Sequence, residues 1–92
     1  MEITEVRVRI KNEEKLKAFV NITIDNAIAV RGLKVIEGKN GLFVSMPNRK
    51  RKDGKFEDIV HPINNETRQK MEEVILNAYK EELEKQNSQT SA

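Results

Sequence analysis

Hydrophobic and polar residues alternate along four successive stretches in the first half of the chain. In residues 4–11 the apolar side chains take the even positions and most charged ones the odd positions, which is the two-residue period of a half-buried strand. Residues 16–25 repeat this alternation most clearly, and residues 28–37 and 42–46 continue it. The pattern predicts four antiparallel strands in succession, which is typical of a meander.

Turn signals separate the predicted strands. They lie at residues 12–14, at Asp25-Asn26 and at the Gly-Lys-Asn-Gly stretch of residues 38–41. Within the third stretch the inward-facing parity changes from even to odd across Arg31-Gly32. Because an extra residue in one strand shifts its alternation by one position, the change predicts a β-bulge at Gly32.

A charged loop and a return strand follow the fourth predicted strand. Pro47 ends that strand, and residues 48–55 contain a turn signal at Asp53-Gly54. Residues 56–60 predict a short return strand, so the loop would protrude at the tip of a long hairpin. Phe56 is the one aromatic residue beside the loop, and we expect it in the core.

A single helix is predicted in the last third of the chain. Proline disfavours helix at the residue before it, so the helix begins after His61-Pro62, with Asn64 or Asn65 as its cap. One helical face is apolar; its members are Met71, Val74, Ile75, Ala78 and Tyr79, widened by Leu76 and Leu83. Residues 85–92 are polar and without periodicity, and we expect a disordered tail there.

These elements predict an α+β fold in one domain of residues 1–84. We expect an antiparallel meander of four to five strands, a protruding basic hairpin loop and one C-terminal α-helix. A chain of 92 residues buries only a small core, and one helix cannot cover both faces of the sheet. Because Phe19 lies with the otherwise polar face of its strand, we expect a homodimer built on sheet edges or exchanged helices.

The composition excludes several classes of site. The chain has no cysteine and one histidine, which excludes a disulfide framework and leaves almost no room for a protein-only zinc site. The sequence contains no nucleophile, metal or cofactor constellation, so we expect no cofactor and no enzymatic activity. It has no apolar run near the ~20 residues of a membrane span and no signal-peptide pattern at its start, so we expect a cytoplasmic protein without membrane or small-molecule partners.

Three features contain residue types found in catalytic or phosphate-binding sites but lack the context or spacing that such sites need. His61 precedes a proline and has no serine or cysteine nucleophile near it, so we interpret it as a hydrogen-bonded structural histidine. Glu57 and Asp58 are adjacent on a predicted strand and point to opposite faces, so we expect them to balance the loop charge. Residues 38–41 lack the Lys-Ser/Thr ending of a phosphate-binding loop.

The formal net charge of +2 is unevenly distributed. Residues 48–55 carry five basic residues against one acidic residue, a net +4, so the rest of the chain sums to −2. Residues 66–84 of the predicted helix carry three basic and six acidic residues, a net −3. A phosphate backbone repels such a helix and attracts the loop. The expected nucleic-acid-binding residues are Arg49, Lys50, Arg51, Lys52 and Lys55, with Arg7 and Arg9 as a second basic stripe.

The charge pattern alone leaves two alternatives open. A charge-rich loop is often only a solvated connection between elements. The rival function is that of a protein-interaction module of the cell-division or regulatory machinery, using the acidic helix face or an open sheet edge. If the loop binds nucleic acid, its lack of aromatic residues predicts phosphate contacts with modest sequence preference, unless Arg49 or Arg51 reaches guanine edges.

Several ordered segments resemble the SpoVG family, named after stage V sporulation protein G. The three main segments are VIEG leading into GLFVSMP within residues 35–47, DGKF at 53–56 and DIVHPIN at 58–64. Two further segments are similar, VRVR at 6–9 and ITID at 22–25. The resemblance covers residues 1–80.

This resemblance implies a dimeric bacterial regulator that binds DNA and also RNA and is tied in different members to gene regulation, sporulation and septation. It implies that Arg49 and Lys50 contact nucleic acid, because they fall where the family carries a basic pair; Arg51 and Lys52 are our extension. The chain departs from the family in having Arg51-Lys52 where Thr-Pro is frequent and Lys55 where an acidic residue is common. It also lacks a long acidic tail. The loop is therefore more basic here, and neither its preference for DNA or RNA nor a role in spore formation follows.

Overall fold

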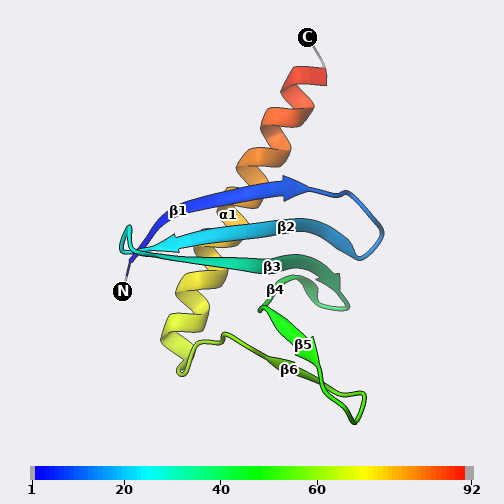
Figure 1. The fold of residues 1–92 in the computed structure, drawn as a ribbon. Helices are drawn as coiled ribbons and strands as arrows, with labels where there is room; N and C mark the ends of the chain where they lie inside the picture. Colours follow the sequence, from blue (N-terminus) through cyan, green and yellow to red (C-terminus); the bar gives the residue numbers. More distant parts are fainter. Residues whose placement is uncertain (1, 91–92) are drawn as a thin grey trace.

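The fold is a four-stranded antiparallel sheet with one helix against one face (Figure 1). The computed structural model describes residues 2–90. The strands follow the order β1-β2-β3-β4, which confirms the predicted meander. Their bounds are Ile3–Ile10 for β1, Leu16–Ile24 for β2, Ile28–Gly38 for β3 and Gly41–Ser45 for β4.

A bulge in β3 explains the change of parity in the sequence. Between the pairs Ile22–Val30 and Val20–Leu33, two residues of β3 lie opposite one residue of β2. Gly32 occupies the bulge with a φ of 86°, a conformation that costs a residue with a Cβ atom about 1–2 kcal/mol. The bulge at Gly32 is therefore confirmed, and it keeps both halves of β3 facing the same core.

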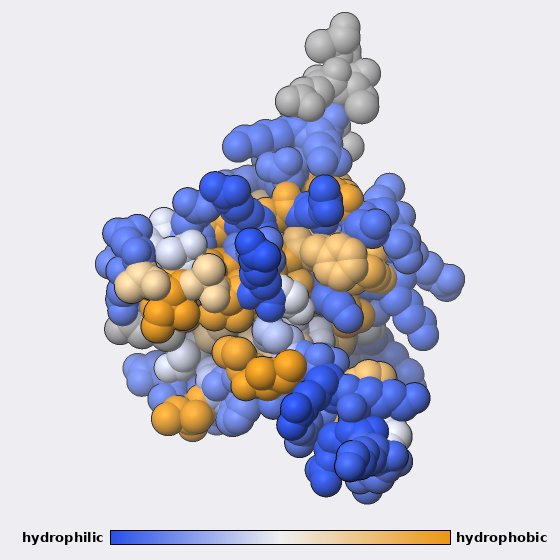
Figure 2. Space-filling model, viewed as in Figure 1, coloured by the Kyte–Doolittle hydropathy of each residue, from blue (hydrophilic) through white to orange (hydrophobic). Residues whose placement is uncertain are grey.

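A separate hairpin follows the sheet and points away from it (Figure 1). Its strands β5 (Asn48–Lys50) and β6 (Phe56–Asp58) pair only with each other, so the predicted return strand exists but does not extend the meander. The expectation that Phe56 is in the core is wrong: the residue is 70% exposed, on a two-stranded ribbon that pairs with no other strand within residues 2–90. Figure 2 shows strongly hydrophilic side chains over the hairpin tip.

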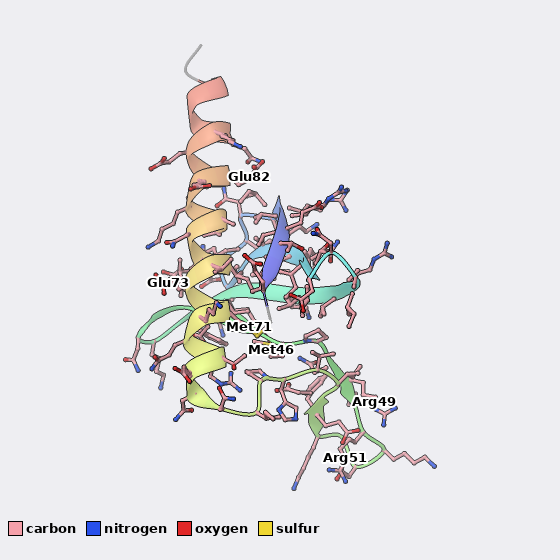
Figure 3. All side chains as sticks on the ribbon, turned by 90° about the vertical axis from the view of Figure 1, so that its left-hand side faces the viewer. Met46, Arg49, Arg51, Met71, Glu73 and Glu82 are labelled. Atoms are coloured by element: carbon pink, nitrogen blue, oxygen red, sulfur yellow. The ribbon has the colours of Figure 1, made fainter. Side chains whose placement is uncertain are left out.

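Helix α1 (Asn65–Thr90) stands on one side of the sheet (Figure 3). Asn64 caps it, since its Oδ1 accepts a 2.8 Å hydrogen bond from the backbone N–H of Thr67. The helix continues to Thr90, so residues 85–90 of the expected tail are helical; residues 91–92 lie outside the described part. Adding a residue to an existing helix gains a backbone hydrogen bond without the cost of nucleation, and the apolar stripe marks only the packed length. Within residues 2–90 no helix combines the length and apolar composition needed to cross a membrane.

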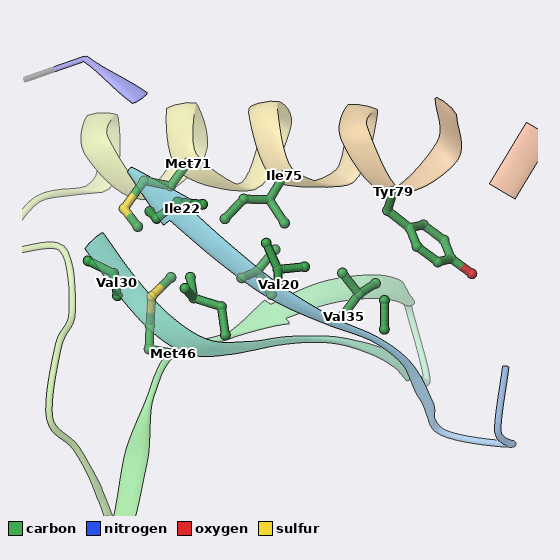
Figure 4. Packing of buried hydrophobic residues seen from close by; sticks show 11 residues of the cluster. Val20, Ile22, Val30, Val35, Met46, Met71, Ile75 and Tyr79 are labelled. Atoms are coloured by element: carbon green, nitrogen blue, oxygen red, sulfur yellow. The ribbon is translucent and has the colours of Figure 1, made fainter. Parts of the chain in front are cut away.

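The core lies between α1 and the helix-facing side of the sheet. Met71 and Ile75 point from α1 toward Val20 and Ile22 (Figure 4). The buried side chains are Ala18, Val20, Ile22, Val30, Leu33, Val35, Val44, Met46, Met71, Ile75 and Tyr79. This confirms the predicted inward positions of β2 and β3 except at two residues. Leu16 is half-buried and outside the core cluster, because a register shift separates it from Ala18. Ile28 is 60% exposed, because it lies at the sheet end beside the Asp25-Asn26 turn. The core fixes which sheet face the helix covers and which it leaves open.

Candidate nucleic-acid interface

Backbone hydrogen bonds shape the tip of the β5–β6 hairpin. The N–H of Arg51 donates to the carbonyl of Lys55 at 2.7 Å, and the N–H of Gly54 donates to the carbonyl of Arg51 at 3.1 Å. Asp53 Oδ1 accepts the N–H of Lys55 at 3.0 Å, and Gly54 has a φ of 86°. This is a three-residue hairpin loop with a glycine in the left-handed region, as the Asp-Gly pair predicts. Hydrogen bonds within residues 51–55, one of them to the Asp53 side chain, therefore define the shape of the loop.

Cross-strand register gives the two arginines of the hairpin a shared counterion. Arg49 lies opposite Glu57, and its Nη2 and Nε are both 3.0 Å from Glu57 Oε1. Arg51 Nε lies 4.0 Å from Glu57 Oε2, while its Nη2 lies 3.8 Å from Asp53. The expectation that the acidic residues balance the loop is confirmed for Glu57. Asp58 joins no ion pair among the described residues.

The three lysines of the hairpin differ from its arginines. Lys50, Lys52 and Lys55 are exposed and make no ion pair with a carboxylate within residues 2–90. The whole hairpin, residues 48–58, carries five basic and three acidic residues, a net +2. A ligand phosphate would therefore meet three unpaired ammonium groups and two guanidinium groups that already share carboxylates.

The charged side chains of the hairpin surround an open hollow of ≈ 480 Å³. It is lined by Arg49, Lys50, Arg51, Lys52, Asp53 and Glu57. Four of these residues are candidates from the sequence, so the structure brings them together around one space. Lys55 lies at the base of the loop, opposite Arg51, and does not line the hollow.

Arg7 and Arg9 are not part of the hairpin. They lie on β1, the sheet edge opposite β4, from which the chain continues into the hairpin. Arg7 is ion-paired with Glu5, and Arg9 lies opposite Phe19 of β2. The second basic stripe is therefore a feature of the sheet face and not an extension of the loop.

Two further cations on the same sheet face were not predicted from the sequence. Lys34 lies opposite Phe19, and Arg31 lines a hollow of ≈ 350 Å³ together with Arg7. The signal for Lys34 was its parity opposite to the buried Leu33, and the signal for Arg31 was its parity opposite to the buried Val30 on the other side of the bulge. Without the cross-strand register, the sequence did not place them beside Arg7 and Arg9.

The acidic helix and the basic hairpin lie on different sides of the sheet. Figure 3 shows Glu73 and Glu82 on α1 at one side of the sheet and Arg49 and Arg51 at the other. The acidic helix therefore lies away from the side that presents the basic hairpin. A polyanion approaching the hairpin side does not pass over the helix carboxylates.

The one histidine lies at the surface between β6 and α1. His61 is exposed, and its Nδ1 lies 3.1 Å from the carbonyl oxygen of Pro62, which fits the predicted hydrogen-bonded role. Among the described residues, no group of three or more His, Cys, Asp or Glu side chains is placed to hold a metal ion.

Comparison with known families places this geometry in context. A family model described as SpoVG matches residues 1–81. The chain belongs to the SpoVG family. The match ends within α1 and includes every strand and the entire β5–β6 hairpin.

Relatives named "Putative septation protein SpoVG" are similar over nearly the whole chain. The one from Anaeromyxobacter sp. (strain K) is 60% identical over 85 residues, which is 92% of this chain and 84% of the relative. The one from Bdellovibrio bacteriovorus is 58% identical over 83 residues, 90% and 77% of the two chains. The one from Thermoanaerobacter sp. (strain X514) is 54% identical over 87 residues, 94% and 95% of the two chains.

The segments that resemble SpoVG frame the hairpin in the structure. Residues 35–47 form the end of β3, β4 and the entry to β5, and residues 58–64 lead from β6 to the cap of α1. The N–H of Ile59 donates to the carbonyl of Pro47 at 2.7 Å and joins the two segments at the hairpin base. This bond ties the segment that enters β5 to the segment that leaves β6.

Proposed function

We propose that this protein is a nucleic-acid-binding regulator that contacts the phosphate backbone with its β5–β6 hairpin. The observation that carries the proposal is the gathering of five basic residues on one ordered hairpin, on the side of the sheet away from the acidic helix. Lysine and arginine side chains presented this way release counterions from a nucleic acid. DNA and RNA share the phosphate backbone that the hairpin would contact.

The protein would regulate by occupying a nucleic acid and not by catalysis. Its relatives carry septation in their names, and the family name refers to sporulation. We therefore assign the regulation to septation and related developmental control. The alternative function is that of a protein-interaction module of the division machinery. In that case, replacing the hairpin charges would not change binding to the partner protein.

We propose that the protein acts as a homodimer through the apolar segment 56–63. This segment leaves four large hydrophobic side chains exposed, and Ile63 is 89% exposed. Contiguous exposed apolar surface on a small domain is typical of an interface. A dimer would present two basic hairpins to one nucleic acid.

The Ile63→Asp variant is expected to shift the protein toward monomer, because a carboxylate in a buried apolar contact must be desolvated. Sedimentation velocity at about 10 μM compares it with wild type, and a loss of at least tenfold in dimer affinity corresponds to about 1.4 kcal/mol. Ile28→Asp, at another exposed isoleucine, is the control. A wild type that sediments as a monomer at this concentration would contradict the dimer.

The Glu57→Gln variant tests the hairpin assignment by a gain of affinity. The substitution keeps the side-chain shape and removes the carboxylate shared by Arg49 and Arg51. One extra phosphate contact raises the logarithm of the binding constant by about 0.9 when the salt concentration falls from 1 M to 0.1 M. Affinity for duplex DNA should therefore rise up to about eightfold at 0.1 M salt. Exposed ion pairs contribute only about 0–1 kcal/mol, so the fold should be retained.

Fluorescence anisotropy with a labelled duplex measures this gain. Glu73→Gln on α1 makes the same charge change at an exposed position on the acidic side and should alter affinity less than twofold. Equal gains in both variants would mean that only the net charge matters and that the hairpin is not the contact.

A further inference from the structure

All three phenylalanines lie outside the buried core. The core contains one aromatic residue, Tyr79, whereas Phe43 is 42% exposed, Phe56 is 70% exposed and Phe19 is half-buried. Phenylalanine is among the residues most often fully buried in folded domains. Two of the three, Phe19 and Phe43, belong to the sheet strands β2 and β4. A sheet that places its phenylalanines on the face opposite its core has aromatic surface available to a ligand.

Register places Phe19 among positive charges. Arg9 of β1 and Lys34 of β3 are its cross-strand neighbours on the same face. Lys11 Nζ lies 5.7 Å from the ring centroid. The ring also lines a hollow of ≈ 220 Å³ with Arg7, Arg9 and Asn21. The ring therefore lies between cations contributed by two neighbouring strands.

Phe43 forms a second aromatic position on this face. It lies opposite Ile36 of β3, and its ring packs beside Gly38, where a Cβ atom would approach the ring to 3.0 Å. Lys34, which neighbours Phe19, is two residues before Ile36 on the same strand face. The two rings are thus on the same side of the sheet, with Lys34 and Ile36 of β3 between their strands.

We call this surface the open face and define it by Arg9, Phe19, Lys34, Ile36 and Phe43. It is opposite the helix, and in Figure 2 apolar side chains on the side away from α1 are interspersed with hydrophilic ones. The β5–β6 hairpin lies toward the same side (Figure 3). Two acidic residues near the open face are neutralised by ion pairs, because Glu5 pairs with Arg7 and Glu37 pairs with Lys17. Charge complementarity therefore favours a polyanionic occupant.

We propose that the open face binds single-stranded nucleic acid, with bases stacked on Phe19 and Phe43 and phosphates held by Arg9, Lys11 and Lys34. Aromatic rings on an exposed four-stranded sheet can stack on unpaired bases, whereas a duplex keeps its bases stacked inside. The inference takes its ligand class from the proposed function, but it uses a different surface from the hairpin. RNA and single-stranded DNA share this chemistry.

The test compares single-strand with duplex binding in the Phe19→Leu/Phe43→Leu double variant. Leucine keeps apolar bulk and removes the π-face, so affinity for labelled oligouridine and oligothymidine of about 12 nucleotides should fall roughly 5- to 100-fold. Affinity for duplex DNA should change less than about twofold, because the hairpin is intact. Oligouridine and oligothymidine titrations then show whether RNA or DNA binds more tightly.

Ile28→Ala is the control, since it removes apolar bulk from an exposed position outside both the open face and the hairpin. Single-strand affinity should be retained in this variant, and in wild-type NMR titrations the Phe19 and Phe43 ring protons should shift more than those of Tyr79, which is buried in the core. Unchanged single-strand binding in the double variant, or an equal loss in Ile28→Ala, would overturn the open-face site while leaving the hairpin proposal intact. A change of oligomeric state in the double variant would also overturn it, because a second copy would then cover the face. Wild-type protein that binds single strands but not duplex would contradict the hairpin proposal alone.

Discussion

Replacing Lys50, Lys52 and Lys55 by alanine is expected to weaken duplex DNA binding by roughly 500-fold per hairpin at about 0.1 M salt. Each phosphate contact raises the logarithm of the binding constant by about 0.9 when the salt concentration falls from 1 M to 0.1 M. Three contacts therefore raise it by about 2.7. These lysines have the largest expected effect because they make no ion pair with a carboxylate among the described residues. Anisotropy titration of one labelled duplex at fixed salt measures the loss.

A control with the same change in net charge separates the hairpin from bulk electrostatics. Lys70, Lys80 and Lys85 are three exposed lysines on α1, and alanine preserves helix there. The triple alanine variant on the helix should lose less than about threefold in affinity, because long-range charges are screened beyond ~10 Å at this salt. Similar losses in both triple variants would show that the protein binds through its total charge, and the hairpin would have no special role.

The Ile75→Ala variant is expected to lose about 2–5 kcal/mol of unfolding free energy. Ile75 is fully buried at the centre of the α1–sheet contact, where it faces Val20 and Ile22 (Figure 4). The deletion leaves a cavity that the surrounding sheet cannot close. Since total stability of a domain of this size is of the order of 5–15 kcal/mol, the loss is a large share. Urea unfolding followed by circular dichroism gives the value.

Ile28→Ala is the matched control for the core. The same side chain is removed from an exposed position, and the expected cost is within about 0.5–1 kcal/mol. Equal destabilisation by the two substitutions would contradict the assignment of the core to the helix-facing side of the sheet.

The core-facing side of the sheet could be predicted because even and odd positions of a strand point to opposite faces. The apolar positions identify the face that packs against the core, and the change of parity at Gly32 indicates a bulge. The hairpin was less predictable. Phe56 looks like a core residue in sequence, but burial depends on a second layer, and no element of the described chain packs over β6. The helix end escaped prediction because helix propagation needs no apolar stripe.

The candidate site was predictable in composition but not in geometry. Charge counting identified residues 48–55, whereas the distinction between paired arginines and unpaired lysines depends on the register that sets Arg49 opposite Glu57. Likewise, Phe19 was visible as an apolar residue on a polar strand face. Its cationic surroundings came from β1 and β3, which are distant in sequence and adjacent only in the folded sheet.

The slope of log Kobs against log salt concentration counts the phosphate contacts that the hairpin makes. Filter-binding titrations on one duplex compare wild type with the Arg49→Ala/Lys50→Ala variant. The slope of the variant should be smaller in magnitude by about 0.9 for each lost contact, and therefore by roughly 2 to 4 for a dimer. An unchanged slope would contradict the hairpin as the nucleic-acid contact.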